Sequence, residues 1–211
     1  MRFILFVEGY TEDKALPAFL KRWLDARLTK PVGIRVVRFE GWPELVKDVA
    51  KKAKMHLNGP SKDDIIAVIS LLDLYGPTFY PDKASESGVR YDWGKQYLEA
   101  IVDQSKFFQF FAVHEVEAWL LSDPEIFPQK VKSALPKKID RPETVNFTEP
   151  PAKLLERLYS QHTHRSYKKV VNQSRFSISK MPKAQGAIGY PADVGGACRI
   201  IASAPALSLS H

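Results

Sequence analysis

Carboxylates follow three apolar segments of this sequence, each at the point where the segment ends. Glu8 comes directly after the first apolar run, Asp73 closes a run rich in isoleucine and leucine, and Glu115 and Glu117 follow a run of phenylalanines. When such side chains share one site, their charges repel and some of their pKa values rise unless a divalent cation neutralises them. Oxygen ligands of this kind suit Mg²⁺ or Mn²⁺. The pattern therefore predicts a site for one of these ions.

The segments that carry these acids have the patterns of an α/β protein. Strand-like runs and helix-like spacing alternate over the first 120 residues, which is typical of a parallel sheet with crossover helices. We expect strands within 2–7, 33–41, 63–76 and 107–113, helices at 14–28, 42–57 and 95–104, and a long loop at 77–94. All strands of a parallel sheet end at the same edge, where ligands bind. The four acids are therefore expected to converge there.

Each of these residues also has a purely structural interpretation. Glu8 serves as a polar end to its strand, Asp73 as a side-chain cap of the following turn, and His114 as a core histidine bonded to the backbone. The geometry after the phenylalanine run stays open: an extended chain puts the two glutamates on one side, whereas a helix puts His114 and Glu117 on one face. The coincidence of three strand ends favours the metal site.

Basic residues are concentrated in the second part of the chain. The net charge is +7, with 17 lysines and arginines against 19 acids in residues 1–129 and 13 against 4 in residues 130–183. A basic segment of this kind can follow a phosphate backbone, although a solvated basic face has the same composition. We accordingly expect an α/β core at 1–127 that carries the acidic site, and a basic, mostly helical extension at 128–211 packed on that core.

The remaining composition excludes several classes of protein. The longest apolar stretches have the length of strands, not the roughly 20 residues of a membrane span, and Glu8 comes too early for a signal peptide. We therefore expect a soluble cytoplasmic protein. The single cysteine, Cys198, excludes an intramolecular disulfide framework and a thiolate zinc site. Within the extension, helical patterns occur at 150–159, 165–171 and 191–205.

Three motifs together resemble one bacterial family. VEGYTED at 7–13, LLDLYG at 71–76 and HEVEAWLLSDPE at 114–125 are similar to the family called domain of unknown function 4276 (DUF4276), which in turn looks like a Toprim domain. The resemblance covers residues 2–127 well and continues more loosely through PPAKLLERLY and SYKK. It implies a Toprim-like, Rossmann-like, mainly parallel sheet flanked by helices. Toprim domains occur in topoisomerases, primases and nucleases of the overcoming-lysogenization-defect type, all of which act on phosphodiesters with Mg²⁺.

The resemblance also implies roles for individual residues. Glu8 matches the strand-one glutamate that acts as general base or acid or holds metal, and Asp73 matches the first aspartate of the second motif. The usual Asp-x-Asp reads Asp-Leu-Tyr here and ends in Tyr75, a neutral side chain that is a poor Mg²⁺ ligand. Glu115 or Glu117 is the candidate replacement, which keeps the charge count and changes the geometry.

The leading hypothesis is a metal-dependent phosphodiester hydrolase, a DNA or RNA nuclease. The ion would polarise the phosphoryl oxygen and activate a water, while the remaining carboxylate or His114 would shuttle a proton and a lysine would steady the developing charge. Basic side chains of the extension are expected to bind the nucleic-acid backbone, namely Lys153, Arg157, Arg165, Lys168 and Lys169. The candidates for the charge-steadying lysine are Lys153, Lys168 and Lys169.

Two other functions are compatible with the sequence. One is a non-catalytic nucleic-acid-binding or regulatory subunit with a degenerate Toprim-like site, which Tyr75 favours, whereas Glu8, Asp73 and the His-Glu-x-Glu motif favour catalysis. The other is nucleotidyl transfer of primase type, which ranks last because the sequence has no glycine-rich phosphate loop. The resemblance also implies an ATPase partner of the structural-maintenance-of-chromosomes type in phage defence, and we allow for a homodimer.

Overall fold

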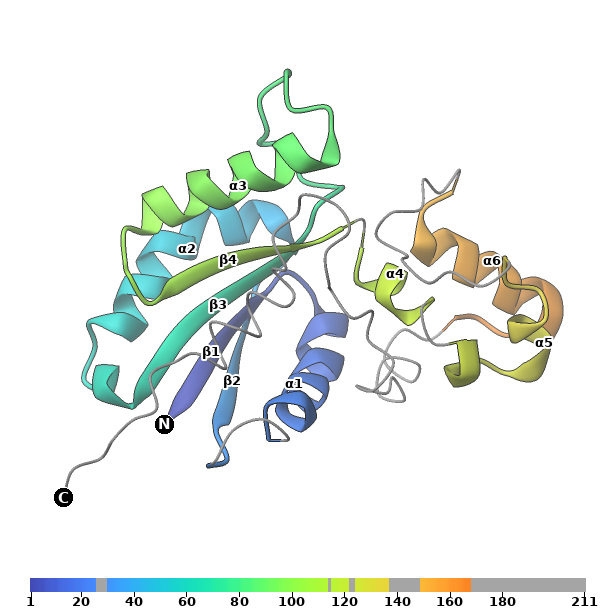
Figure 1. Cartoon of the computed structure of the whole chain (residues 1–211), viewed down its shortest axis with the longest axis horizontal. Helices are drawn as coiled ribbons and strands as arrows, with labels where there is room; N and C mark the ends of the chain where they lie inside the picture. Colours follow the sequence, from blue (N-terminus) through green and yellow to red (C-terminus); the bar gives the residue numbers. More distant parts are fainter. Residues whose placement is uncertain (26–29, 114, 122–123, 137–148, 168–211) are drawn as a thin grey trace.

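Four parallel strands form one sheet in this protein (Figure 1). The computed structural model describes residues 1–25, 30–113, 115–121, 124–136 and 149–167. The strands are β1 (Arg2–Val7), β2 (Gly33–Arg38), β3 (Ile65–Asp73) and β4 (Phe107–Ala112). They lie side by side in the order β2-β1-β3-β4. All neighbouring pairs are parallel. The predicted α/β class with a parallel sheet is therefore confirmed.

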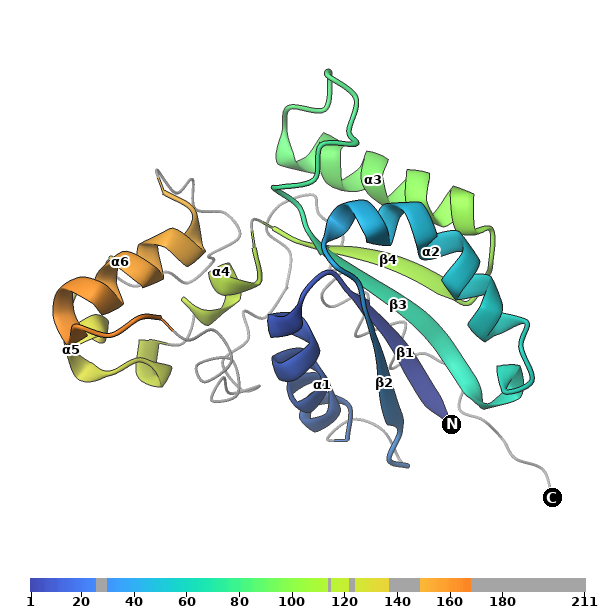
Figure 2. The ribbon, with the colours of Figure 1, turned by 180° about the vertical axis from the view of Figure 1, so that it is seen from behind.

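Helices cover both faces of the sheet. α2 (Trp42–Leu57) and α3 (Ser87–Val102) pack on one face and α1 (Tyr10–Asp25) packs on the other, as the two opposite views show (Figures 1 and 2). Each connection from one strand to the next contains one of these helices, because parallel strands need a long crossover. The sheet is the middle of three layers.

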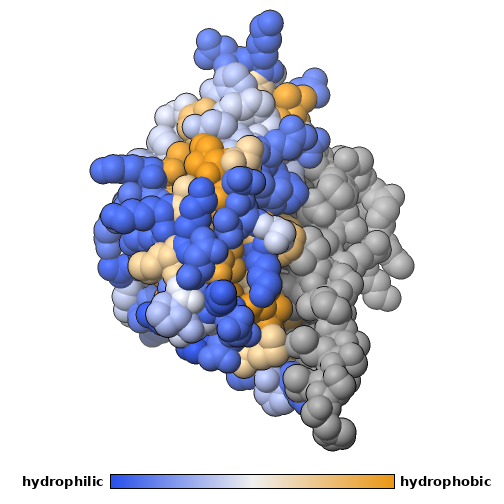
Figure 3. Space-filling model, turned by 90° about the vertical axis from the view of Figure 1, so that its left-hand side faces the viewer, coloured by the Kyte–Doolittle hydropathy of each residue, from blue (hydrophilic) through white to orange (hydrophobic). Residues whose placement is uncertain are grey.

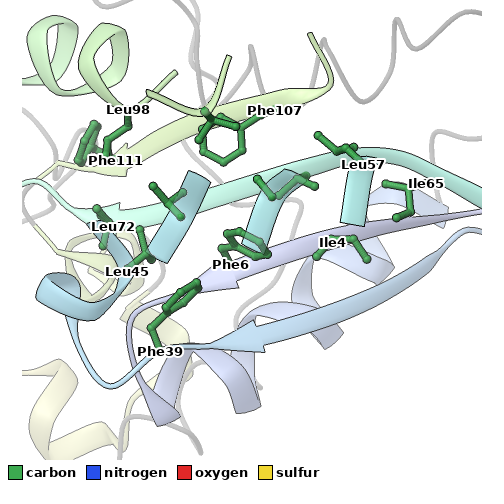
Figure 4. Packing of buried hydrophobic residues seen from close by; sticks show 14 of the residues in the cluster. Ile4, Phe6, Phe39, Leu45, Leu57, Ile65, Leu72, Leu98, Phe107 and Phe111 are labelled. Atoms are coloured by element: carbon green, nitrogen blue, oxygen red, sulfur yellow. The ribbon is translucent and has the colours of Figure 1, made fainter. Parts of the chain in front are cut away.

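This layering explains why β1 is almost entirely apolar. Successive side chains of a strand point to opposite faces, so a strand that is covered on both sides has no polar face. Phe3, Leu5 and Val7 belong to the core under α1, whereas Ile4 and Phe6 belong to the core under α2 and α3 (Figure 4). Full burial of each such side chain contributes about 1.5–3 kcal/mol to stability.

The strand register brings the carboxyl ends of β1 and β3 together. Val7 lies beside Leu71, and Asp73 lies beside Ala112 of β4. Because β3 continues past its last pair with β1, its end reaches the level of the residues that follow β1. The acids at the ends of these two strands therefore start from adjacent backbone.

A smaller group of helices lies beyond the carboxyl edge of the sheet (Figure 1). It consists of α4 (Val116–Leu120), the 3₁₀ helix η2 (Pro124–Ile126), α5 (Gln129–Lys132) and α6 (Pro151–Thr163). Its apolar core includes side chains from both sides of position 127, among them Leu121, Phe127, Leu155 and Tyr159. The division of the chain at that position stays a prediction.

The extension is described only in part. α6 confirms the helix predicted at 150–159. The helix predicted at 165–171 is absent from its described residues, 165–167, which are not helical. The helix predicted at 191–205, and with it Cys198, lies outside the described residues.

α1 begins earlier than its sequence pattern predicts. It starts at Tyr10, where the N–H of Asp13 donates to the carbonyl of Gly9 at 3.2 Å, and it contains Pro17. A proline inside a helix removes a backbone hydrogen bond and normally costs stability. Leu16 is buried in the core under the sheet, and this packing offsets the loss.

Two other predicted boundaries differ from the structure. α3 begins at Ser87, so the predicted loop at 77–94 is shorter, because Tyr91 is already buried against the sheet. The second strand ends at Arg38 and does not reach residue 41. The chain after β4 turns helical only at Val116, so Glu117 is helical and Glu115 precedes the helix. His114 lies outside the described residues, so a face shared by His114 and Glu117 stays a prediction.

The side of the molecule where α2 and α3 end is mostly polar. Hydrophilic side chains cover most of this face, with smaller apolar areas between them (Figure 3). Among the helices that the structure describes, none combines the length and the apolar composition needed to cross a membrane. Glu8 and Asp73, in contrast, lie at the carboxyl ends of their strands.

Gly94 in α3 generates a prediction about packing. A Cβ atom here would lie 2.9 Å from Cζ of Phe111 and 2.9 Å from Cε1 of Tyr80. We expect Gly94→Ala to lower the free energy of unfolding by about 1–3 kcal/mol, although alanine is the better helix former. Urea denaturation measures the change. Gln96→Ala, at an exposed position of the same helix, is the control and should change little; a Gly94→Ala variant as stable as wild type would contradict this packing.

Candidate functional site

The carboxylate of Glu8 lies against the end of β3. Its Oε1 atom accepts a hydrogen bond from the backbone N–H of Asp73 at 3.3 Å. Glu8 is the first residue after β1 and Asp73 is the last residue of β3. The structure therefore brings together two of the residues that the sequence analysis placed in one site.

The side chain of Asp73 turns toward the segment that follows β4. Its Oδ1 atom accepts a hydrogen bond from the backbone N–H of Val116 at 3.1 Å. Val116 is the first residue of α4, and N–H groups at the start of a helix have no partner within the helix. Asp73 supplies this partner. Glu115 and Glu117, which flank Val116 in the sequence, are thereby held near the end of β3.

The carboxylate of Glu115 faces the helical group. Its Oε2 atom accepts a hydrogen bond from the backbone N–H of Ala152 at 3.0 Å, in the first turn of α6. The cap residue of that helix is Pro150, which provides no side-chain hydrogen bond, so Glu115 takes the place of a local cap. The positive end of the helix dipole also favours negative charge here. Glu115 therefore connects the site to α6.

Two further glutamates near the site are buried. Glu117 is 0% exposed and Glu12, in the first turn of α1, is 8% exposed. Gly9 makes room for the second of these, since a Cβ on Gly9 would lie 2.7 Å from Oε2 of Glu12. Glutamate is among the residues that are almost never fully buried without compensation. Two such residues in one place indicate a functional constraint.

Asp73 experiences the charge of all the other acids. Burial raises the pKa of Asp73 well above its usual range, and the charges of Glu8, Glu117, Glu12 and Glu115 raise it further. Four glutamates from separate parts of the chain thus act on the one aspartate at the end of β3. Such a set either keeps a proton or binds a cation.

Two tyrosines border these acids. Burial raises the pKa of Tyr167, and the charge of Glu117 adds to this effect. In the described part of the chain, the Tyr167 hydroxyl is buried without a hydrogen-bond partner. Burial also raises the pKa of Tyr80; Arg90 acts in the opposite direction and Glu8 in the same direction. Both phenols therefore stay neutral, and each can donate a hydrogen bond.

The predicted basic residues lie at the surface or outside the described residues. Lys153, Arg157 and Arg165 are exposed. Arg157 pairs with Glu149, with 2.8 Å between Nη2 and Oε2, and its hydrogen bonds lower the pKa of that glutamate. An exposed pair of this kind is weak and readily exchanged. The remaining predicted site residues lie outside the described residues: His114, Lys168 and Lys169.

The donor chemistry of the site suits a divalent cation. Carboxylate oxygens are the ligands that Mg²⁺ prefers, and Asp73 carries the raised pKa of a carboxylate surrounded by like charges. As placed, the described residues contain no group of three acidic, histidine or cysteine side chains that could hold an ion. Glu8, Asp73 and Glu115 instead accept bonds from backbone amides. The residues fit such an ion in kind, and ligation requires their carboxylates to turn.

The sequence analysis missed two residues of this site. Glu12 appeared there only as part of the motif VEGYTED, and Tyr167 only as part of the loosely matching SYKK. The spacing of four between Glu8 and Glu12 across the turn after β1 is a usable signal. Tyr167 offers no comparable signal, because its place beside Glu117 depends on the packing of the extension.

Comparisons with known proteins agree with the family prediction. A family model described as Domain of unknown function (DUF4276) matches residues 7–182. No curated protein matches the chain. Similar solved structures include two forms of the C-terminal region of the Xanthomonas campestris pv. campestris OLD protein. The form phased with iodine is 20% identical, with 100% of this chain and 98% of that chain covered and a TM-score of 0.45. The form phased with platinum is 19% identical, with 96% and 93% covered and a TM-score of 0.42.

The C-terminal region of the Burkholderia pseudomallei OLD protein is similar as well. It is 22% identical, with 82% of this chain and 85% of that chain covered and a TM-score of 0.40.

The raised pKa of Asp73 predicts how stability depends on pH. Without metal, the folded protein keeps a proton on Asp73 to a higher pH than the unfolded chain does, so stability falls as the pH rises above the usual carboxyl range. Asp73→Asn keeps an acceptor for Val116 and removes the charge. We expect this variant to be more stable near neutral pH, by about 1.4 kcal/mol for each unit of the pKa shift.

Thermal unfolding in a chelator between about pH 4 and pH 8 tests this expectation. Asp92→Asn, at an exposed position of α3, is the control and should leave the pH profile unchanged. An Asp73→Asn variant with the pH dependence of the wild type would show that the pKa of Asp73 is not raised in the folded protein.

The bond between Glu115 and α6 predicts a difference between two substitutions. Glu115→Ala removes the acceptor for the N–H of Ala152 and should cost about 0.5–2 kcal/mol. Glu115→Gln keeps an acceptor oxygen and should retain most of that stability. Hydrogen exchange at the first turn of α6 and urea denaturation measure both effects. Equal behaviour of the two variants would contradict the capping role.

Proposed function

This chain belongs to the DUF4276 family, and from its site we propose that it is a metal-dependent phosphodiester hydrolase, a nuclease that acts on DNA or RNA. One observation carries the proposal: Glu8 accepts from the amide of Asp73, and Asp73 accepts from the amide of Val116. Carboxylates from separate parts of the chain are thereby gathered at the carboxyl edge of a parallel sheet, where such sheets bind ligands.

The proposed ligands of the ion are Glu8, Asp73 and either Glu115 or Glu117. Bound Mg²⁺ or Mn²⁺ would supply the charge that polarises a phosphoryl oxygen and generates a nucleophile from water. Without an ion, the negative charges of the set repel one another, as the raised pKa of Asp73 indicates. The cation therefore replaces repulsion with attraction, which supports its choice over a purely structural role for the acids.

The residues around the ligands have separate tasks in this proposal. Glu12 is buried next to Gly9 and adds negative charge that holds the cation without touching it. The neutral, buried hydroxyl of Tyr167 would donate a hydrogen bond to a carboxylate of the site or to water. A carboxylate that is not engaged with the ion, or His114, takes the proton from the attacking water.

Lysine near the site provides positive charge for the substrate. Lys153 directly follows Ala152, whose amide contacts Glu115, and it is exposed. An exposed ammonium in the first turn of α6 could contact a phosphate that approaches the ion. Lys168 and Lys169 follow Tyr167 in the sequence and are proposed for the same purpose, with Arg157 and Arg165 as contacts to the backbone farther along.

Two observations favour a second function. Tyr75 stands where a further acid is expected, and the described residues hold no preformed group of three ligands. Both facts favour a non-catalytic nucleic-acid-binding or regulatory subunit. In either case an ATPase partner and a place in phage defence are proposals that rest on the resemblance, and a homodimer is a separate proposal.

Substitution of two acids tests the catalytic proposal. We expect Glu8→Gln and Asp73→Asn each to reduce Mg²⁺-dependent cleavage of labelled DNA or RNA by at least about 100-fold, because each removes a ligand charge while keeping the shape. Circular dichroism should show an unchanged fold. Glu156→Gln, exposed on α6, is the control and should cleave like the wild type. Retained cleavage in either site variant would refute the mechanism.

Titration with Mn²⁺ separates the two candidate functions. The catalytic proposal requires calorimetric binding of Mn²⁺ by the wild type and its loss in Glu8→Gln. Absence of binding to the wild type at millimolar metal would support the non-catalytic subunit instead.

A further inference from the structure

Tyr75, the residue that replaces the expected acid, is held at the edge of the site. It lies two residues after the carboxyl end of β3, outside any helix or strand, and it is 36% exposed. Gly76 follows with φ at 125°, a conformation that side chains rarely adopt, and turns the chain there. Tyr75 thus presents an aromatic ring two positions beyond Asp73.

Arg90 fixes this ring and adds positive charge. Its guanidinium carbon lies 5.1 Å from the ring centre of Tyr75 and 4.8 Å from that of Tyr80. Its Nε donates to the carbonyl of Ala84 at 3.2 Å. The two rings and the carbonyl carry no net charge, so these contacts do not neutralise the positive charge of Arg90. A cation held beside an exposed aromatic ring is suited to a phosphate next to a base.

The aromatic surface continues from Tyr80 along α3. Phe79 stacks on Tyr80 with 4.4 Å between ring centres, and Trp93 stacks on Tyr97 with 4.7 Å. Phe79 and Tyr97 are also stacked, at 5.8 Å. These rings cover one another, and Phe79 and Tyr80 are partly buried against the core. Tyr97 is 39% exposed, so it is the member of this series that reaches the surface.

A second exposed tyrosine follows the other site acid. Tyr10 comes two positions after Glu8, is 58% exposed and has Lys14 at 5.3 Å and Arg38 at 5.8 Å from its ring centre. Both cations also pair with adjacent acids, at 3.1 Å and 2.6 Å. Exposed pairs of this kind are weak, so a phosphate can replace them.

We infer that Tyr75 and Arg90, with Tyr10 and its cations, bind an unpaired stretch of nucleic acid, so that the substrate is single-stranded. An aromatic ring gains stacking energy from any base whose face is available, and in a duplex both faces are already covered by neighbouring pairs. The cations beside the rings complement the phosphates between such bases. The inference rests on the proposed function, in which the nearby acids form a phosphodiester hydrolase site. It explains why a tyrosine stands in place of an acid.

Fluorescence anisotropy in a chelator tests this inference without cleavage. The probes are labelled single-stranded DNA, single-stranded RNA, a DNA duplex of the same sequence and an abasic strand of the same length. We expect both single strands, or one of them, to bind more tightly than the duplex and the abasic strand. Tyr75→Leu should weaken that binding about tenfold, Tyr75→Phe should retain it, and Arg90→Ala should weaken it as well. Arg2→Ala, at the amino end of β1, is the control and should bind normally.

The outcomes separate this inference from the proposed function. Equal affinity for the abasic strand, tighter binding of the duplex, or unchanged affinity in a folded Tyr75→Leu variant would overturn the inference, even where Mg²⁺-dependent cleavage is found. Binding of single strands that depends on Tyr75 would support it, even where no cleavage is found and the proposed hydrolase activity fails. Circular dichroism of each variant confirms that the comparison concerns folded protein.

Discussion

Repulsion between carboxylates held close together is the constraint on which this structure depends. Asp73 lies in the field of four glutamates, and its pKa is raised by burial and by their charges. Three of the acids are held by backbone N–H groups, those of Asp73, Val116 and Ala152. Such bonds stabilise the charged carboxylates, whereas burial stabilises the neutral ones. Under the proposed function, a divalent cation would ease this conflict, because its positive charge attracts the carboxylates that repel one another.

The same hydrogen bonds join parts of the chain that are far apart in sequence. β1 and β3 meet through their register in the sheet, and α4 begins on the side chain of Asp73. α6 is then attached through Glu115. The small group of helices beyond the sheet is thus fixed to the sheet through acidic side chains as well as through its own apolar core. The acids of the candidate site therefore also hold separate parts of the fold together.

Much of this arrangement can be predicted from the sequence, because it follows from local patterns. Apolar runs locate the strands, and parallel pairing then places their carboxyl ends at one edge, so the proximity of Glu8 and Asp73 can be foreseen. The start of α3 could not, because glycine and aromatic residues obscure its helical spacing. The site role of Glu12 was hidden, since a glutamate in the first turn of a helix already has a local explanation. The contact between Glu115 and α6 depends on packing that no local pattern encodes.

The bond from Ala152 to Glu115 has a consequence for communication within the molecule. A ligand that draws the Glu115 carboxylate toward itself removes the acceptor that holds the first turn of α6. Occupancy of the acidic site and order in that turn are then coupled, and the coupling free energy is the same in both directions. A partner that stiffens α6 would weaken the ligand, and one that loosens the turn would strengthen it. Under the proposed function, the order of the first turn of α6 would therefore change with the occupancy of the acidic site.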